Sequence, residues 1–167
     1  MTMMNTIKKL AATSLMLLAT HGAFAAIALE SKAPDFTLHT TAGSNLRLQE
    51  QRGKVVMINF WATWCGPCQQ ELPKLNQLYV KYQAAGFELL GVNVDDDVKH
   101  ATDVATRLGL KFPVLLDTDK SLSKLYDLST MPSTLIIDRD GKVHYIHKGY
   151  LAGVENDYEK QIRELLK

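Results

Sequence analysis

An apolar run that leads directly into a pair of cysteines constrains the fold of this chain most. The run "VVMINF", Val55 to Phe60, is typical of a strand that is buried on both faces. Beyond the cysteines, apolar residues recur at helical spacing from Leu72 until Gly86 ends the pattern. A buried strand followed at once by a helix predicts an α/β fold with Cys65 and Cys68 at the junction.

The rest of the chain continues this alternation. Further strands are predicted at "FELLGVNVD" and "FPVLLD", with a helix over 98–108 between them. The runs "STLIID" and "KVHYIHKGY" flank the four-residue turn "DRDG", so these two strands must be antiparallel. Apolar and polar residues alternate on both sides of 42–44, which predicts an N-terminal hairpin. The last predicted element is an amphipathic helix. We expect one domain over 26–167, with a mixed central sheet flanked by helices.

The first 25 residues have the pattern of a secretory signal peptide. Lys8 and Lys9 precede the apolar run "LAATSLMLLAT", and Ala23-Phe24-Ala25 is a small-residue cleavage site. This pattern predicts that 1–25 is removed after Ala25 and that the mature protein is periplasmic. An uncleaved anchor is the alternative, because apolar residues continue to Leu29. Such an anchor needs about 20 apolar residues, however, and polar residues and a glycine interrupt this run at 20–22.

Charge and composition exclude several classes of partner. The chain is 46% hydrophobic and 22% charged, which is an ordinary globular composition. Without Lys8 and Lys9 the basic residues fall from 19 to 17, against 18 acidic ones, so no basic excess favours nucleic acid. Two cysteines are too few for a disulfide-stapled miniprotein. A hydrophobic core must therefore stabilise the domain, which we expect to be a monomer.

The cysteine pair admits several chemistries. If the helix begins near Cys65, its unpaired backbone N–H groups and dipole favour a thiolate there. Cys68, three residues on, is within reach of a disulfide with Cys65. A structural zinc site needs four ligands, yet the mature chain adds only histidines and no second cysteine pair. Inert core thiols and a purely structural disulfide stay open, although a disulfide closing so short a loop restricts the unfolded chain little.

The context of the pair resembles the exported TlpA/ResA-like branch of the thioredoxin superfamily. The motif "WCGPC" is identical to the thioredoxin active-site motif, and it follows a predicted buried strand and opens a helix. The stretches "APDF", "INFWATWCGPCQQELP", "FPVLLD" and "MPSTLIIDRDGKV" also follow the pattern of this branch, over nearly the whole mature chain. The resemblance implies a thioredoxin fold with an N-terminal hairpin and a helix–strand insert over 98–117. It implies no metal and no cofactor apart from a redox-active Cys65–Cys68 disulfide.

The resemblance also implies roles for individual residues. Cys65 corresponds to the nucleophile of the family and Cys68 to its resolving cysteine. Pro132 corresponds to the family's cis-proline beside the disulfide, and the Met131 backbone would pair with an extended client segment. The substrate-binding residues implied in this way are Trp64, Gly66, Pro67, Met131 and Pro132.

Two positions depart from the thioredoxin pattern. Thioredoxins carry a buried aspartate behind the resolving cysteine and a lysine in the next strand, where this chain has Asn59 and Gly91. Asn59 cannot accept a proton near neutral pH. The resemblance to ResA-like proteins favours an acid at the end of the second strand instead. We therefore predict Asp96 as the catalytic proton acceptor for Cys68, with Asp95 as the alternative and a solvated acidic loop as the plainest interpretation.

The function that the resemblance implies is reduction of disulfides in exported client proteins. Apocytochrome c is an implied client, and a membrane reductase of the DsbD/CcdA type is the implied electron donor. Three other functions stay open: a peroxiredoxin-like peroxidase, a dithiol oxidant, and a non-enzymatic copper-binding or chaperone module that uses the two thiols. Peroxiredoxins share "APDF" but lack a WCGPC pair. The dipeptide Gly66-Pro67 disfavours an oxidant, because the same dipeptide accompanies a potential of about −270 mV in thioredoxin.

Overall fold

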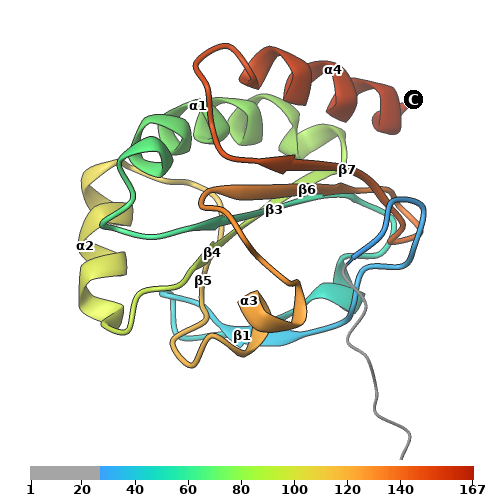
Figure 1. Cartoon of the computed structure of the whole chain (residues 1–167). Helices are drawn as coiled ribbons and strands as arrows, with labels where there is room; N and C mark the ends of the chain where they lie inside the picture. The colour runs from blue at the N-terminus through green and yellow to red at the C-terminus, as the bar shows by residue number, and fades with distance from the viewer. Residues whose placement is uncertain (1–26) are drawn as a thin grey trace, which may run out of the picture.

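A five-stranded mixed sheet forms the centre of the molecule (Figure 1). The computed structural model describes residues 27–167, so the predicted signal peptide over 1–25 lies outside the described residues. In sheet order β5-β4-β3-β6-β7, the strands are β5 (Val114–Leu116), β4 (Phe87–Asn93), β3 (Val55–Trp61), β6 (Ser133–Ile137) and β7 (Val143–Lys148). β3, β4 and β5 are parallel, while β6 pairs antiparallel with both β3 and β7. The predicted mixed sheet and the antiparallel final pair are confirmed.

Helices and a hairpin cover the two faces of this sheet. α1 (Gly66–Tyr82) and α4 (Glu155–Leu166) lie side by side over one face (Figure 1). α3 (Ser121–Leu125) and the antiparallel hairpin of β1 (Thr37–His39) and β2 (Asn45–Arg47) lie over the other. Short 3₁₀ helices, η1 (Leu48–Gln51) and η2 (Gln83–Ala85), precede β3 and β4. α2 (Val98–Arg107) and β5 form the predicted insert, and the predicted hairpin is also present.

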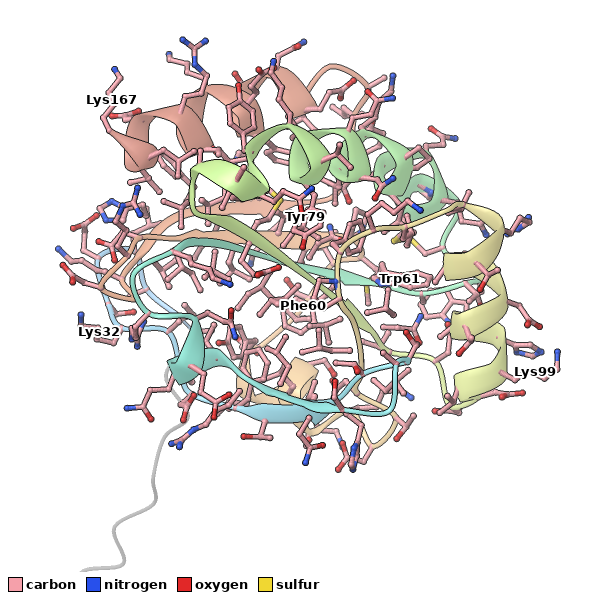
Figure 2. The ribbon with its side chains drawn as sticks, turned by 180° about the vertical axis from the view of Figure 1, so that it is seen from behind. Lys32, Phe60, Trp61, Tyr79, Lys99 and Lys167 are labelled. Atoms are coloured by element: carbon pink, nitrogen blue, oxygen red, sulfur yellow. A yellow bond between two sulfur atoms is a disulfide. The ribbon has the colours of Figure 1, made fainter. Side chains whose placement is uncertain are left out.

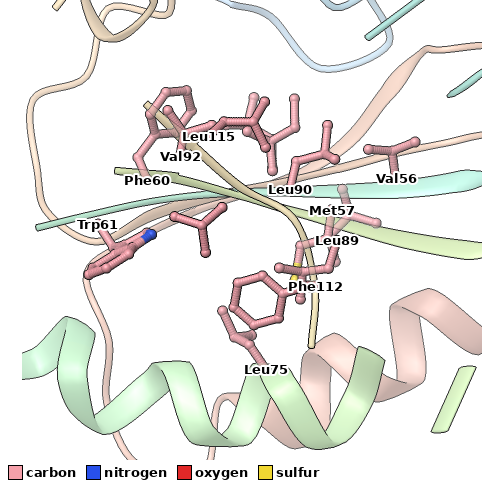
Figure 3. Close-up of a cluster of buried hydrophobic side chains, with 14 of the residues drawn as sticks. Val56, Met57, Phe60, Trp61, Leu75, Leu89, Leu90, Val92, Phe112 and Leu115 are labelled. Carbon is pink, nitrogen blue, oxygen red and sulfur yellow. The ribbon is translucent and has the colours of Figure 1, made fainter. Parts of the chain in front are cut away.

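The hydrophobic core lies on both sides of the two central strands. Every residue of β3 and β4 is buried, as the apolar runs predicted. Phe60 and Trp61 lie inside the molecule, whereas Lys99 and Lys167 project from its surface (Figure 2). Trp61 points toward α1, while Phe60 points to the opposite face of the sheet (Figure 3). Strand alternation therefore also directs Asn59 toward α1. Among residues 27–167, no helix has the length and apolar character needed to cross a membrane.

Gly91 is required by close packing in this core. A Cβ atom at this position would lie 2.6 Å from the Phe112 ring and 3.4 Å from Trp61 Nε1. We expect Gly91→Ala to lower the free energy of unfolding by about 1–3 kcal/mol, the usual cost of overpacking a core, as measured by urea denaturation. Phe112→Leu in the same background should recover part of the loss, because it removes the ring. An alanine variant as stable as the wild type would contradict this packing.

Candidate active site

The two cysteines lie where β3 ends and α1 begins. Cys65 is the N-cap of α1, and Pro67 lies in its first turn, where the missing proline N–H breaks no helix hydrogen bond. The cysteines form a disulfide, with 5.3 Å between their Cα atoms. The backbone N–H of Cys68 donates to Cys65 Sγ at 3.2 Å. This donor and the helix dipole would stabilise negative charge on the Cys65 sulfur after reduction.

Access to the disulfide differs between its two ends. Cys65 is 5% exposed, whereas Cys68 is fully buried. Trp64 is 71% exposed beside them, and Gly66 and Pro67 are also exposed. A client that docks on this surface would therefore reach the Cys65 sulfur and not the Cys68 sulfur.

The loop before β6 lies at the same end of the sheet. The Met131–Pro132 peptide bond is cis, and Ser133, the next residue, pairs with Phe60 of β3. This pairing places Pro132 beside the end of β3 that leads into the cysteines. Gly149, after β7, donates its N–H to the Pro132 carbonyl at 2.8 Å. The predicted substrate-binding residues thus belong to two places at the same end of the sheet: the junction of β3 with α1, and the loop before β6.

Asp96, the predicted proton acceptor, lies on the surface of the molecule. β4 ends at Asn93, so Asp96 lies in the loop that follows the strand. The Asp96 side chain is 91% exposed and pairs with Lys120. An acid in bulk solvent is poorly placed to accept a proton from the fully buried Cys68, so the predicted role of Asp96 gains no support from this position.

Asp95, the alternative acid, holds the loop between β3 and the cysteines. It is 6% exposed, and its carboxylate accepts hydrogen bonds from the Thr63 backbone N–H at 3.0 Å and the Thr63 hydroxyl at 3.1 Å. Asn93 Nδ2 donates to the same carboxylate at 2.7 Å. Through these three hydrogen bonds, the Asp95 carboxylate links the end of β4 to the loop that carries Trp64.

A different carboxylate, that of Glu71, lies behind the cysteines. Glu71 is one helical turn after Cys68 on the same side of α1 and is fully buried. Its Oε2 accepts from Asn59 Nδ2 and its Oε1 from the Tyr158 hydroxyl, both at 2.8 Å. Burial raises the pKa of Glu71 to about 7, even though these two donors oppose the rise. The titratable group therefore lies on the helix, while Asn59 occupies the strand position that carries an aspartate in thioredoxins.

Sequence reasoning missed Glu71, although a signal was present. Glu71 falls on the helical stripe of Cys68, Leu72 and Leu75, all of which are buried in α1. Charged residues are rarely found on the apolar stripe of an amphipathic helix. A lone acid at such a position indicates either a buried partner or a functional carboxylate.

Comparison with known proteins agrees with this geometry. The AhpC/TSA family model matches residues 29–146. Thiol-disulfide oxidoreductase ResA of Geobacillus thermodenitrificans (strain NG80-2) is 43% identical over 127 residues, which cover 76% of this chain and 73% of the relative. A Chlorobium tepidum crystal structure provisionally designated thiol:disulfide interchange protein DsbE has a TM-score of 0.82 and 36% identity, covering 85% of this chain and 100% of that chain.

A second Chlorobium tepidum structure, a thiol:disulfide interchange protein of the thioredoxin family, has a TM-score of 0.74 and 25% identity, again covering 85% and 100% of the two chains. The predicted thioredoxin fold is confirmed, and fold and site together define a thiol–disulfide oxidoreductase. The chain belongs to the AhpC/TSA family and, within it, is a ResA-like thiol–disulfide oxidoreductase.

Proposed function

We propose that this oxidoreductase works as a reductase, which transfers electrons from Cys65 and Cys68 to disulfides of exported proteins. The observation that carries the proposal is the asymmetry of the pair. Cys65 lies at a helix N-terminus beside the exposed Trp64, whereas Cys68 lies behind it in the same helical turn as the buried Glu71. An accessible nucleophile and a buried resolving thiol with a titratable neighbour are the parts that the reaction needs.

The reaction would proceed through two thiol–disulfide exchanges. The Cys65 thiolate attacks one sulfur of a client disulfide, the client S–S bond breaks, and the other client sulfur leaves as a thiolate that takes up a proton. Cys68 then attacks Cys65 Sγ and breaks the mixed disulfide. The client gains two electrons and leaves as a dithiol, while the protein is left with its Cys65–Cys68 disulfide.

Glu71 would serve as the proton acceptor for the second exchange. Burial disfavours a charged Cys68 thiolate, so a base that takes the thiol proton lowers the barrier to resolution. A pKa of about 7 leaves both forms of Glu71 populated near neutral pH. The carboxylate can therefore accept the proton in one step and release it in the next.

The cellular setting is proposed on family resemblance. We place the protein in the periplasm as a monomer, cleaved after Ala25. A membrane reductase of the DsbD/CcdA type would return electrons to the disulfide, and apocytochrome c is a candidate client. The client surface would consist of Trp64, Gly66, Pro67, Met131 and Pro132.

A turnover assay with two substrates tests the reductase proposal. With dithiothreitol as electron donor, the protein should reduce insulin disulfides, and Cys65→Ser should abolish this activity. Hydrogen peroxide in place of insulin should be consumed no faster by the wild type than by Cys65→Ser. Peroxide turnover that matches or exceeds insulin reduction would instead support the peroxidase alternative.

A further inference from the structure

A buried cluster of four polar residues surrounds the proposed proton acceptor. The Glu71 cluster consists of Glu71 on α1, Asn59 on β3, Thr134 on β6 and Tyr158 on α4, each at most 1% exposed. Asn59 Nδ2 bonds to both Glu71 and Thr134 Oγ1, each at 2.8 Å. Buried polar groups are costly unless they are hydrogen-bonded, so these contacts fix the carboxylate in one position.

We infer that Tyr158 is a positioning residue for the reaction: its hydroxyl holds the Glu71 carboxylate and sets the pH range in which that carboxylate can take a proton from Cys68. This inference rests on the role of Glu71 proposed above. It assigns the C-terminal helix a part in the chemistry, although Tyr158 lies 87 residues from Glu71 in the sequence.

The Tyr158 hydroxyl is placed to donate its hydrogen bond to the Glu71 carboxylate. Its hydroxyl donates to Oε1 at 2.8 Å, and a donor to the charged form favours ionisation of a carboxyl group. Burial, followed by the neighbouring Glu71 charge, raises the pKa of Tyr158 well above its ordinary value, so the hydroxyl keeps its proton. The His147 ring packs edge-on against Tyr158 at 4.8 Å and bonds to Gln161 at 2.9 Å, which holds the phenol ring in place.

Other titratable groups near the carboxylate act at longer range. Glu155, also on α4, raises the pKa of Glu71 by like-charge repulsion, and Lys74 on α1 partly offsets the Glu155 charge. Tyr150, between β7 and α4, is near enough for Glu71 to raise its pKa, although burial is the larger cause. β3 and β6 contribute only neutral groups to the cluster. Among the described side chains, only Tyr158 and Asn59 donate hydrogen bonds to the Glu71 carboxylate.

Two-phase reaction of the reduced protein with 5,5′-dithiobis(2-nitrobenzoate) tests the inference. The first nitrothiobenzoate is released when Cys65 attacks the reagent, and the second when Cys68 resolves the mixed disulfide. Tyr158→Phe should raise the pH midpoint of the second phase by about one unit, which makes that phase about tenfold slower below the midpoint. The first phase should be unchanged. An unchanged second midpoint would overturn the inference.

Matched variants separate this inference from the proposed function. Tyr126→Phe removes another buried hydroxyl, which donates to the Pro34 carbonyl at 2.8 Å, and should leave both phases unchanged. Glu71→Gln should remove the pH step of the second phase, and adding Tyr158→Phe should then change nothing further. If Glu71→Gln leaves the step in place, the proposed proton acceptor is wrong. If Glu71→Gln removes the pH step but Tyr158→Phe leaves the midpoint of that step where the wild type has it, only the positioning role of Tyr158 is wrong.

A second measurement covers the case in which Tyr158→Phe fails to fold. Wild-type protein can be expressed in cells that are supplied with 3-fluorotyrosine in place of tyrosine. The fluorinated phenols are more acidic than those of tyrosine and are therefore stronger hydrogen-bond donors. The Glu71 carboxyl carbon, followed by ¹³C NMR in the reduced protein, should then titrate at a lower pH than in unlabelled protein. A midpoint that stays the same would overturn the inference, because fluorination leaves the packing of the ring nearly unchanged.

Discussion

Cys68→Ser should accumulate mixed disulfides with client proteins, whereas Cys65→Ser should trap none. Both variants should lose turnover by roughly a thousandfold or more, as expected when a covalent mechanism loses one of its two sulfurs. The physical reason for the asymmetry is access. Cys65 is the N-cap of α1 and keeps 5% exposure, while Cys68 is fully buried and can attack only Cys65. Non-reducing gels and mass spectrometry of the trapped adducts measure the effect.

Alkylation order provides an independent check on these roles. In reduced wild-type protein at neutral pH, iodoacetamide should label Cys65 first, because the thiolate is the reactive form and the helix N-terminus favours it there. Preferential labelling of Cys68, or client capture by Cys65→Ser, would reverse the assignment of nucleophile and resolving thiol.

Glu71→Gln should slow resolution of the mixed disulfide and, at the same time, stabilise the fold at alkaline pH. Glutamine is nearly isosteric and can still accept from Asn59 and donate to the Tyr158 hydroxyl, so the Glu71 cluster loses its charge but keeps its contacts. Resolution near neutral pH should fall by roughly 10²- to 10⁴-fold, the usual contribution of a general base. The first attack by Cys65 should be nearly unaffected.

The stability effect follows from the direction of the pKa shift. The folded state raises the Glu71 pKa from 4.5 to about 7, so it binds this proton more tightly than the unfolded chain does. The stabilising contribution is therefore fully present below about pH 4.5 and is lost as the pH rises through 7. At about 1.4 kcal/mol per pKa unit, the wild type loses up to about 3.5 kcal/mol of folding stability above that range.

Urea denaturation of the two oxidised proteins at pH 4.5 and pH 8.5 measures this difference. Glu71→Gln should be similar in stability to the wild type at the lower pH and more stable at the higher pH. Gln77→Asn, a change on the exposed side of the same helix, serves as the control and should show no such pH dependence. If the free energies of unfolding of the wild type and Glu71→Gln differ by the same amount at both pH values, Glu71 does not titrate in this range.

Local sequence pattern predicted the strands, the hairpin and the position of the cysteines, because each depends on residues close together in the chain. The resemblance favoured Asp96 as the proton acceptor, but β4 ends at Asn93 and Asp96 lies in solvent beyond it, while the buried carboxylate is that of Glu71 on α1. Tyr158 reaches Glu71 across 87 residues, and Phe112 packs over Gly91 from a separate segment. Such contacts depend on how α4 and the loop before β5 pack on the sheet, which periodicity does not determine.

The reduction potential of the Cys65–Cys68 couple tests the proposed direction of electron transfer most directly. It is measured by equilibrating the protein with glutathione or thioredoxin buffers of known potential and quantifying the dithiol. The Gly66-Pro67 dipeptide and the role proposed here predict a value near the −270 mV or so of thioredoxin, far below the roughly −120 mV of DsbA. A value above about −180 mV, the level of protein disulfide isomerase, would contradict a reductase and identify the protein as a donor of disulfides.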